Sequence, residues 1–190
     1  MNKTRCSWCG TDPLYMAYHD EEWGVPVYID SLLFEFLVLE TFQAGLSWIT
    51  VLRKRENFRK AFDQFDYIKI AAYDEQKYNE LILDQGIIRN KLKVRSTIGN
   101  AMAFMDIQKE YGSFSNYIWN FTNHKPINNQ RADLYQIPAN TDLSNTISKD
   151  LKKRGFKFVG TTVVYAFMQA IGMVNDHVVS CFRYNELMKQ

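Results

Sequence analysis

The stretch KDLKKRGFKFVGTTVVYAFMQ, residues 149–169, is the part of the sequence that best indicates the fold. A charged segment of helical character ends at Gly155, a short turn follows, and an apolar segment begins after Gly160. The second segment is apolar on almost every side, which is typical of a helix buried in a core. These residues therefore predict two helices that are joined by a tight, glycine-containing turn.

The turn of this hairpin has the chemistry of an anion site. Backbone N–H groups at such a turn, and at the start of the helix after it, can bind a phosphate group. Four basic residues lie beside the turn, namely Lys152, Lys153, Arg154 and Lys157. We therefore expect the backbone at Gly160, together with Lys153 and Lys157, to contact a phosphodiester. An ordinary αα-hairpin is the alternative, because the glycine spacing alone is a weak signal.

Signals for the start of a helix recur along the chain. Aspartate, asparagine or serine precedes most of the helical patterns, as expected for N-caps. The residues that we expect to begin helices are Asp12, Asp30, Ser47, Asp66, Asp74, Asn90, Ser113 and Asp142. Residues 122–142 contain two of the four prolines and four asparagines, so we expect them to form the main loop. No strand pattern joined by hairpin turns is evident, and the predicted fold is all-α, with one domain over residues 1–190.

Composition limits the class of protein. The chain has 190 residues, of which 46% are hydrophobic, so it fits one folded domain and is not wholly disordered. No apolar run approaches the roughly 20 residues that span a bilayer, so we expect no membrane association. The first ten residues lack the apolar core of a signal peptide, which predicts a cytoplasmic protein. We also expect it to be a monomer.

The net charge of +2 does not by itself indicate a nucleic-acid partner. However, residues 50–60, 86–96 and 149–157 together contain 14 of the 23 lysines and arginines. A nearly neutral total can therefore conceal a basic face. The alternative is that these residues belong to ordinary solvated helix surfaces.

Cysteine and histidine spacing near the two ends of the chain suggests a metal site. Cys6 and Cys9 are three residues apart, whereas His177 and Cys181 are four apart, a spacing that places neighbours on one helix face. Thiolates and imidazoles in these numbers suit a tetrahedral structural zinc ion. Either Cys9 or His19 would complete the set of four ligands. The alternative is that each cysteine is a small buried apolar residue.

Glu40 interrupts an apolar stripe on the helix expected after Asp30. The stripe consists of Leu33, Phe36, Leu37 and Ala44. A carboxylate on such a face needs a partner, or its pKa rises through burial. One interpretation is a buried ion pair, and the other is a group held for a ligand or for acid–base work. With rings such as Trp48 nearby, the acid would suit a flat, electron-poor ligand that stacks on the rings.

Three stretches of the chain resemble the bacterial 3-methyladenine DNA glycosylase I family. They are DPLYMAYHDEEWG (12–24), QAGLSWITVLRKRENFRKAF (43–62) and KKRGFKFVGTTVVYAFMQAIGMVNDHVVSC (152–181). The resemblance covers essentially the whole chain and implies a helix–hairpin–helix glycosylase fold. It further implies hydrolysis of the N-glycosidic bond of 3-methyladenine in double-stranded DNA. The implied ligands of a structural zinc ion are Cys6, His19, His177 and Cys181, which leaves Cys9 as a spare thiol.

The resemblance also implies roles for other residues. Glu40 would be the catalytic carboxyl that contacts the damaged base. The aromatic residues of the base pocket would be Tyr18, Trp48, Trp8, Tyr15 and Trp23. Gly45 and Leu46 would form the tip that fills the gap left by the flipped nucleotide. The pocket would lie between the zinc-tied ends and the central helices. Relatives have a serine that helps to hold the base where this chain has Ala166, so one hydrogen bond to the base loses its partner.

The end of the hairpin indicates a monofunctional enzyme. Thr161 and Thr162 stand where a glycosylase with a lyase step would have a lysine. Asp176 lies near the position of the catalytic aspartate of many helix–hairpin–helix glycosylases, but it directly precedes His177, so we expect a structural role. Because N3-alkylated adenine carries positive charge, its glycosidic bond is already weak. Capture of the flipped base could then supply much of the rate.

Two other functions fit the composition and the basic residues. One is a zinc-stapled DNA-binding module without catalysis, and the other is a helical protein that binds a small molecule. A groove-reading module has no need of Glu40 among aromatic rings, which argues against the first. The basic hairpin argues against the second.

Overall fold

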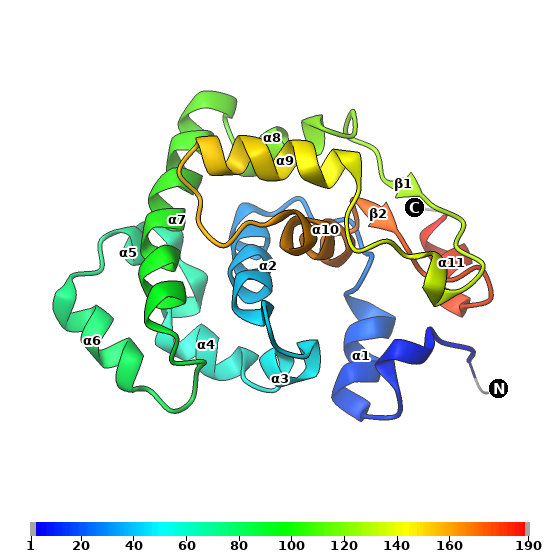
Figure 1. The fold of residues 1–190 in the computed structure, drawn as a ribbon, viewed down its shortest axis with the longest axis horizontal. Coiled ribbons are helices and arrows are strands. Elements are labelled where there is room, and N and C mark those ends of the chain that lie inside the picture. Colours follow the sequence, from blue (N-terminus) through cyan, green and yellow to red (C-terminus); the bar gives the residue numbers. More distant parts are fainter. Residues whose placement is uncertain (1–2, 189–190) are drawn as a thin grey trace.

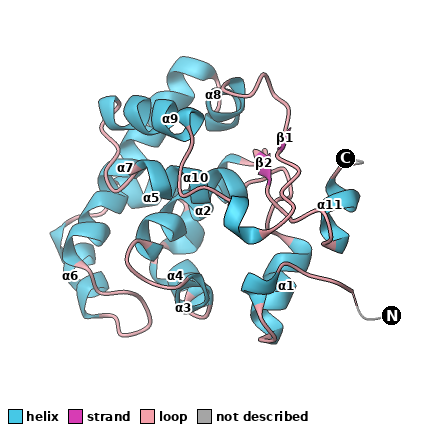
Figure 2. Ribbon diagram, turned by 45° about the vertical axis from the view of Figure 1, so that its right-hand side comes forward, coloured by secondary structure: helices cyan, strands magenta, loops and turns pink. Residues whose placement is uncertain are grey.

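The structure is a computed structural model that describes residues 3–188, so the two residues at each end of the predicted domain lie outside it. The described chain is mostly helical, as predicted (Figures 1 and 2). The α-helices are α1 (Pro13–Glu21), α2 (Asp30–Gln43), α3 (Trp48–Leu52), α4 (Arg55–Ala61), α5 (Tyr67–Ala71), α6 (Glu75–Leu83), α7 (Lys91–Tyr111), α8 (Phe114–Asn120), α9 (Asp142–Lys153), α10 (Thr161–Ala170) and α11 (Phe182–Leu187). None of the described helices has both the length and the hydrophobicity to cross a bilayer.

Two buried helices, α2 and α10, pack against each other in the centre of the molecule (Figure 1). Helix α9 lies along α10, and α7 packs against α2 on the other side. Every residue of α2 from Leu33 to Phe42 is buried. The expected one-sided apolar stripe is therefore wrong, because neighbours surround this helix on all faces. Glu40 lies in the centre of the fold.

Asp30 caps a helix other than the one predicted. It is the first residue of α2, whose N-cap position is occupied by Ile29. The Asp30 carboxylate accepts hydrogen bonds from the backbone N–H groups of Phe114 (2.9 Å) and Ser115 (2.8 Å). Those residues begin α8, so Asp30 satisfies the free donors at the start of a helix distant in the sequence.

Most of the other predicted helix starts are confirmed. The side chains that accept hydrogen bonds from the first turns of α1, α5, α6, α7 and α8 are those of Asp12, Asp66, Asp74, Asn90 and Ser113. Thr141, rather than Asp142, caps α9. The single helix expected after Ser47 is in fact α3 and α4, because the chain turns between them, and the Ser47 side chain makes no cap hydrogen bond.

The predicted main loop, residues 122–142, carries two short elements. Strand β1 (Ile127–Asn128) pairs in parallel with β2 (Val174–Asn175), and a 3-10 turn, η3 (Leu134–Gln136), follows. Two other 3-10 turns are η1 (Ser7–Cys9) and η2 (Asp63–Phe65). Strands of two residues leave no alternation in the sequence, so the all-α prediction misses them. Their pairing fixes the loop beside the segment that follows α10.

The hairpin between α9 and α10 has the predicted form. Gly155 has a φ of 97°, a left-handed conformation that glycine adopts without a steric penalty, and Gly160 is the N-cap of α10. The turn is fixed to α7 by Asn100, whose Oδ1 accepts from the N–H of Lys157 at 2.8 Å and whose Nδ2 donates to the carbonyl of Lys157 at 3.1 Å. The hairpin is thus held rigidly with Lys157 exposed.

Candidate active site and metal centre

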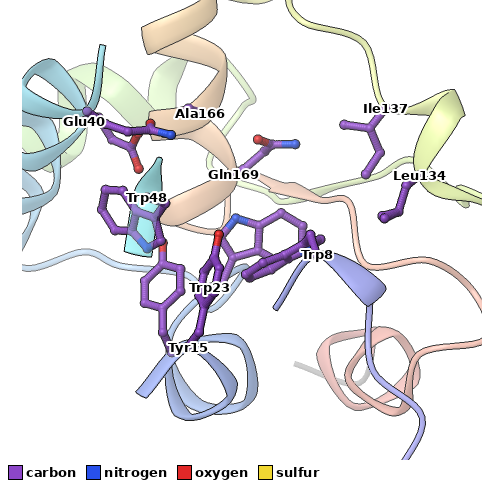
Figure 3. Close-up of a pocket in the computed structure, with 11 residues that line it drawn as sticks. Trp8, Tyr15, Trp23, Glu40, Trp48, Leu134, Ile137, Ala166 and Gln169 are labelled. Atoms are coloured by element: carbon purple, nitrogen blue, oxygen red, sulfur yellow. The ribbon is translucent and has the colours of Figure 1, made fainter. Parts of the chain in front are cut away.

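A cavity of about 340 Å³ opens beside Glu40 between the N-terminal segment, α2, α3 and α10 (Figure 3). Glu40 and all five aromatic residues that the resemblance implies for the base pocket line this cavity: Trp8, Tyr15, Tyr18, Trp23 and Trp48. These side chains come from η1, α1, the segment after α1, α2 and the start of α3. The fold therefore brings together groups from separate parts of the first 48 residues.

Glu40 is 3% exposed, and its Oε2 atom has no hydrogen-bond partner among the described residues. Burial raises the pKa of Glu40 to about 8, because desolvation penalises the charged form. An unpartnered carboxyl in a cavity is a feature expected of a ligand-binding or catalytic group. The interpretation of Glu40 as an ion-pair member is therefore wrong.

Glu35, one and a half turns earlier on α2, shows what a structural carboxylate looks like in this fold. It is 5% exposed, but it accepts hydrogen bonds from Arg55 and Arg59. The two acids are thus similarly buried, but Glu35 is paired with arginines and Glu40 has no partner among the described residues. Only Glu40 is available to a molecule that enters the cavity.

The aromatic rings around the carboxyl contact one another, and Trp8 and Tyr18 join them into one set. The Trp8 ring lies with its centroid 4.9 Å from that of Trp23 and 5.0 Å from that of Tyr15. Tyr18 lies 5.2 Å from Trp48, measured in the same way. The indole Nε1 atoms of Trp8 and Trp48 are buried and have no hydrogen-bond partner within residues 3–188. The cavity therefore offers ring faces for stacking and polar atoms for recognition, which suits a flat heterocycle.

The second cluster consists of Cys6, His19, His177 and Cys181, all buried, and their ligand atoms lie within 4.8 Å of one another. Cys181 Sγ lies 3.4 Å from His19 Nε2 and 3.5 Å from His177 Nδ1, and Cys6 Sγ lies 3.6 Å from His177 Nδ1. Ligands about 2.0–2.3 Å from a central zinc ion would have separations of this size. The four residues could therefore hold a metal ion.

The remaining ring nitrogens support this interpretation. His19 Nδ1 lies 2.8 Å from the Asp20 carboxylate, and His177 Nε2 lies 2.9 Å from the backbone carbonyl of Trp23. Each acceptor holds the proton on the outer nitrogen, which leaves a lone pair on the nitrogen that faces the sulfur atoms. Metal-binding histidines in proteins are usually oriented in this way.

The cluster contains His19, as the resemblance implies, and one expectation about it needs correction. Cys9 is buried next to it, but its thiol donates to the Cys6 carbonyl at 3.2 Å, so His19 and not Cys9 completes the group. His177 and Cys181 are not on a helix, because they lie in the turns between β2 and α11, with Cys181 as the N-cap of α11. The four-residue spacing still indicates a shared site, because a turn also brings residues four apart close together.

Gly45 and Leu46 form the exposed turn between α2 and α3. Gly45 has a φ of 85°, and the Leu46 side chain is 42% exposed despite being apolar. The backbone before this tip is held by Lys93, whose ammonium donates to the carbonyls of Phe42 (2.9 Å) and Ala44 (2.7 Å). Lys93 is buried, and burial lowers its pKa. The tip is an apolar projection on a fixed base, and in the sequence it lies between Gln43 and Trp48, which both line the cavity.

Many of the clustered basic residues are engaged within the protein. Arg55 and Arg59 pair with Glu35, Arg95 pairs with Glu75, and Arg154 pairs with Glu110 and Asp150. Because these arginines are paired with acids, fewer free positive charges remain on the surface than the sequence suggests. The lysines that are exposed around the hairpin are Lys152, Lys153 and Lys157.

A model of the methyladenine glycosylase family matches residues 8–184. The chain belongs to this family. It is 53% identical to DNA-3-methyladenine glycosylase 1 of Escherichia coli (strain K12), over 95% of this chain and 96% of that protein. It is 48% identical to DNA-3-methyladenine glycosylase of Haemophilus influenzae, over 94% and 96%. A solved structure of 3-methyladenine DNA glycosylase I from Staphylococcus aureus, described as the structural basis of its 3-methyladenine recognition, matches with a TM-score of 0.91 at 35% identity. The match covers 94% of this chain and 95% of that one.

Five residues beyond the predicted set complete the pocket of this methyladenine glycosylase family member. They are Gln43, Leu134, Ile137, Ala166 and Gln169. Ala166, which departs from the serine of relatives, presents a methyl group to the cavity. Leu134 and Ile137 come from the long loop, where no periodicity marks them. Gln169 could have been found, because it is an amide within an otherwise apolar helix.

Proposed function

We propose that this chain removes 3-methyladenine from double-stranded DNA by hydrolysing its N-glycosidic bond. Membership of the methyladenine glycosylase family supports this activity. The observation that carries the proposal is the unpartnered carboxyl of Glu40 in a cavity lined by aromatic rings. A base inside a duplex cannot reach such a buried group, so the nucleotide must first leave the stack.

In the proposed mechanism, Glu40 recognises the charge of the alkylated base. A cationic base stabilises the ionised form of a neighbouring carboxyl, so its arrival should lower the raised pKa of Glu40. The rings of Trp48 and Tyr18 stack on the heterocycle. Because N3-alkylation already weakens the bond, contacts that strengthen as the base departs are sufficient to accelerate cleavage. Glu40 then acts as the catalytic residue that contacts the base.

The exposed tip and the hairpin provide the proposed DNA contacts. Leu46 would enter the stack and occupy the gap left by the flipped nucleotide, as apolar wedges do in other DNA-bending proteins. The N–H groups around Gly160, with Lys153 and Lys157, would hold a phosphodiester. One chain contains every group in this scheme, so we propose that it acts as a monomer.

We also propose that the cysteine–histidine cluster binds one structural zinc ion. Two thiolates and two imidazoles match the preference of zinc for sulfur and nitrogen ligands. The ligands come from both ends of the chain, so such an ion would close a loop of almost the entire protein. Zinc would contribute folding energy there and would not take part in base removal. The base pocket lies between this tied region and the central helices.

Release of free base from methylated DNA tests the proposed activity. The protein should release 3-methyladenine from duplex DNA treated with a methylating agent, which chromatography of the ethanol-soluble fraction would measure. The strand should stay intact until alkali is added, because Thr161 is not an amine and bonds to Ser144 and Asn145. Binding to the duplex without any base release would instead favour a non-catalytic DNA-binding module. Binding of the free base without DNA binding would favour a small-molecule protein.

The hairpin lysines should set the salt dependence of binding to undamaged duplex. Replacing Lys152, Lys153 and Lys157 with glutamine should reduce the slope of log K against log salt by up to about 2.7, since each phosphate contact contributes about 0.9. Fluorescence anisotropy over a salt series would measure the slope.

A matched control removes the same charge elsewhere. Each of the lysines Lys69, Lys77 and Lys109 pairs with an acid three residues away in the sequence. Replacing these three lysines with glutamine should change the salt slope little. An unchanged slope in the hairpin variant would place the DNA face elsewhere.

A further inference from the structure

Asp176 links the base pocket to the long loop. It is fully buried, and each of its oxygens accepts two hydrogen bonds. Asn129 Nδ2 (2.7 Å) and Arg131 Nε (3.3 Å), both from the loop, donate to Oδ1. Tyr165 Oη (2.6 Å) and Gln169 Nε2 (2.8 Å), both from α10, donate to Oδ2. The aspartate expected to be structural therefore contacts a side chain that lines the cavity.

This contact fixes which end of the Gln169 amide faces the cavity. A buried carboxylate only accepts hydrogen bonds, so it holds the NH₂ group of Gln169 and would repel its oxygen. Figure 3 shows the Gln169 amide with its nitrogen on the side away from Glu40 and its oxygen on the side toward Glu40. A flipped amide would place oxygen against oxygen and leave a donor of Gln169 unpaired, which is costly at a partly buried site.

The cavity thereby gains a hydrogen-bond acceptor with a fixed position. Gln169 Oε1 makes no hydrogen bond within the described part of the chain, and the neighbouring α10 residue on the cavity, Ala166, offers only a methyl group. An amide oxygen stays an acceptor at every pH, unlike a carboxyl that can carry a proton. A fixed acceptor favours a ligand that presents an N–H group to it.

We propose that Gln169, oriented by Asp176, is a specificity-determining residue that accepts a hydrogen bond from the exocyclic amino group of a 6-aminopurine. This role of Gln169 rests on the proposed removal of 3-methyladenine and specifies how the base is recognised. A 6-oxopurine would bring its own acceptor against Gln169 Oε1, and neither oxygen would find a donor. A site built to pair with an N–H group rejects analogues that lack it, because its polar atom is left unpaired. Asp176 acts as a positioning residue.

Free-base affinities test the inference. The probes are 3-methyladenine and its 6-oxo counterpart 3-methylhypoxanthine, and calorimetry gives the ratio of their dissociation constants. The wild-type protein should prefer the amino compound by about tenfold or more, the effect of one mismatched buried hydrogen bond. Gln169→Leu should bring the ratio close to one, chiefly through weaker binding of 3-methyladenine. Asp176→Asn should also lower the ratio, since asparagine tolerates either orientation of the Gln169 amide.

Tyr165→Phe is the matched control. It removes the other donor to Asp176 Oδ2, so it should lower the melting temperature, but the ratio should stay at its wild-type value. Equal loss of selectivity in this variant would overturn the role of Gln169, because any damage to the Asp176 contacts would then suffice. An unchanged ratio in Gln169→Leu would overturn the inference even if Asp176→Asn failed to fold. In that case the wild-type protein would still release 3-methyladenine from DNA, whereas a failure of the proposed function would abolish that release.

Discussion

Cys6→Ser and Cys181→Ser should each release the metal ion and destabilise the fold severely. A serine hydroxyl is a poor substitute for a thiolate, and the remaining three ligands cannot enclose the ion. Structural zinc sites contribute about 10–16 kcal/mol of apparent binding free energy at neutral pH, so losing one exceeds the usual stability of a domain. Elemental analysis of protein purified without added metal should give one zinc per wild-type chain and far less in the variants.

Cys9→Ser provides the control for that experiment. The Cys9 thiol is equally buried, but it donates to backbone carbonyls and lies outside the cluster. This variant should keep its zinc and most of its thermal stability. A wild-type protein that is stable and folded but contains no zinc would contradict the metal assignment. Equal metal loss in all three variants would point to a set of ligands that includes Cys9.

Glu40→Gln should make the folded protein more stable at pH 8 and above while it weakens base binding. The pKa of Glu40 is about 8 in the folded chain, above its ordinary value of 4.5. The folded state therefore holds a proton that the unfolded chain has lost, and stability falls as the pH rises from about 4.5 to about 8. Glutamine removes this penalty, which is up to about 5 kcal/mol when the carboxyl is fully ionised. Below pH 4.5 the two proteins should be equally stable.

The same substitution should weaken affinity for free 3-methyladenine about tenfold, because a hydrogen bond to a charged group is replaced by one to a neutral amide. Excision should fall but not vanish, since the alkylated bond is weak. Chemical denaturation at several pH values, calorimetry with the free base and single-turnover excision would separate these effects. Near-complete loss of excision with intact base affinity would instead make Glu40 a general base that activates water.

Glu35→Gln is the matched control on the same helix. Its carboxylate pairs with Arg55 and Arg59, so removal of the charge takes the buried partner from both cations and leaves them only the more exposed Glu22 and Glu56. Breaking a buried pair costs about 3–5 kcal/mol when the remaining charge has no other partner, and the contacts with Glu22 and Glu56 should make the loss smaller here. The two glutamate variants should therefore shift stability in opposite directions at pH 8. A destabilised Glu40→Gln protein would refute the assignment of an unpartnered carboxyl.

Features that depend on neighbouring residues could be predicted from the sequence. The caps Asp66 and Asp74, the glycine-containing hairpin and the misplaced Glu40 each leave a local signal. Features that depend on distant contacts could not. Asp30 looks like the cap of α2, but it bonds to α8, 84 residues later.

In the candidate site, too, features set by neighbouring residues could be predicted, and features set by distant contacts could not. The spacing of the four metal-cluster residues indicated a shared site, yet it could not choose between Cys9 and His19, since only the folded chain brings His19 to the two ends. Leu134 reaches the pocket from a loop without periodicity. The orientation of Gln169 depends on Asp176, whose hydrogen-bond donors come from two separate segments, the long loop and α10. Sequence patterns report which side chains are unusual, and tertiary contacts decide what those side chains face.

The buried ammonium of Lys93 would have a mechanical consequence for the proposed insertion of Leu46 into DNA. A side chain that separates stacked bases experiences an opposing force, and a flexible turn would bend instead of transmitting it. Because Lys93 bonds to two carbonyls at the end of α2, the backbone that carries Leu46 is already ordered before DNA arrives, and little conformational entropy remains to be lost on contact. The force is passed to α7, a helix of 21 residues that packs against α5 and α8. In the proposed complex the tip would thus act as a stiff probe, and the distortion would be concentrated in the duplex.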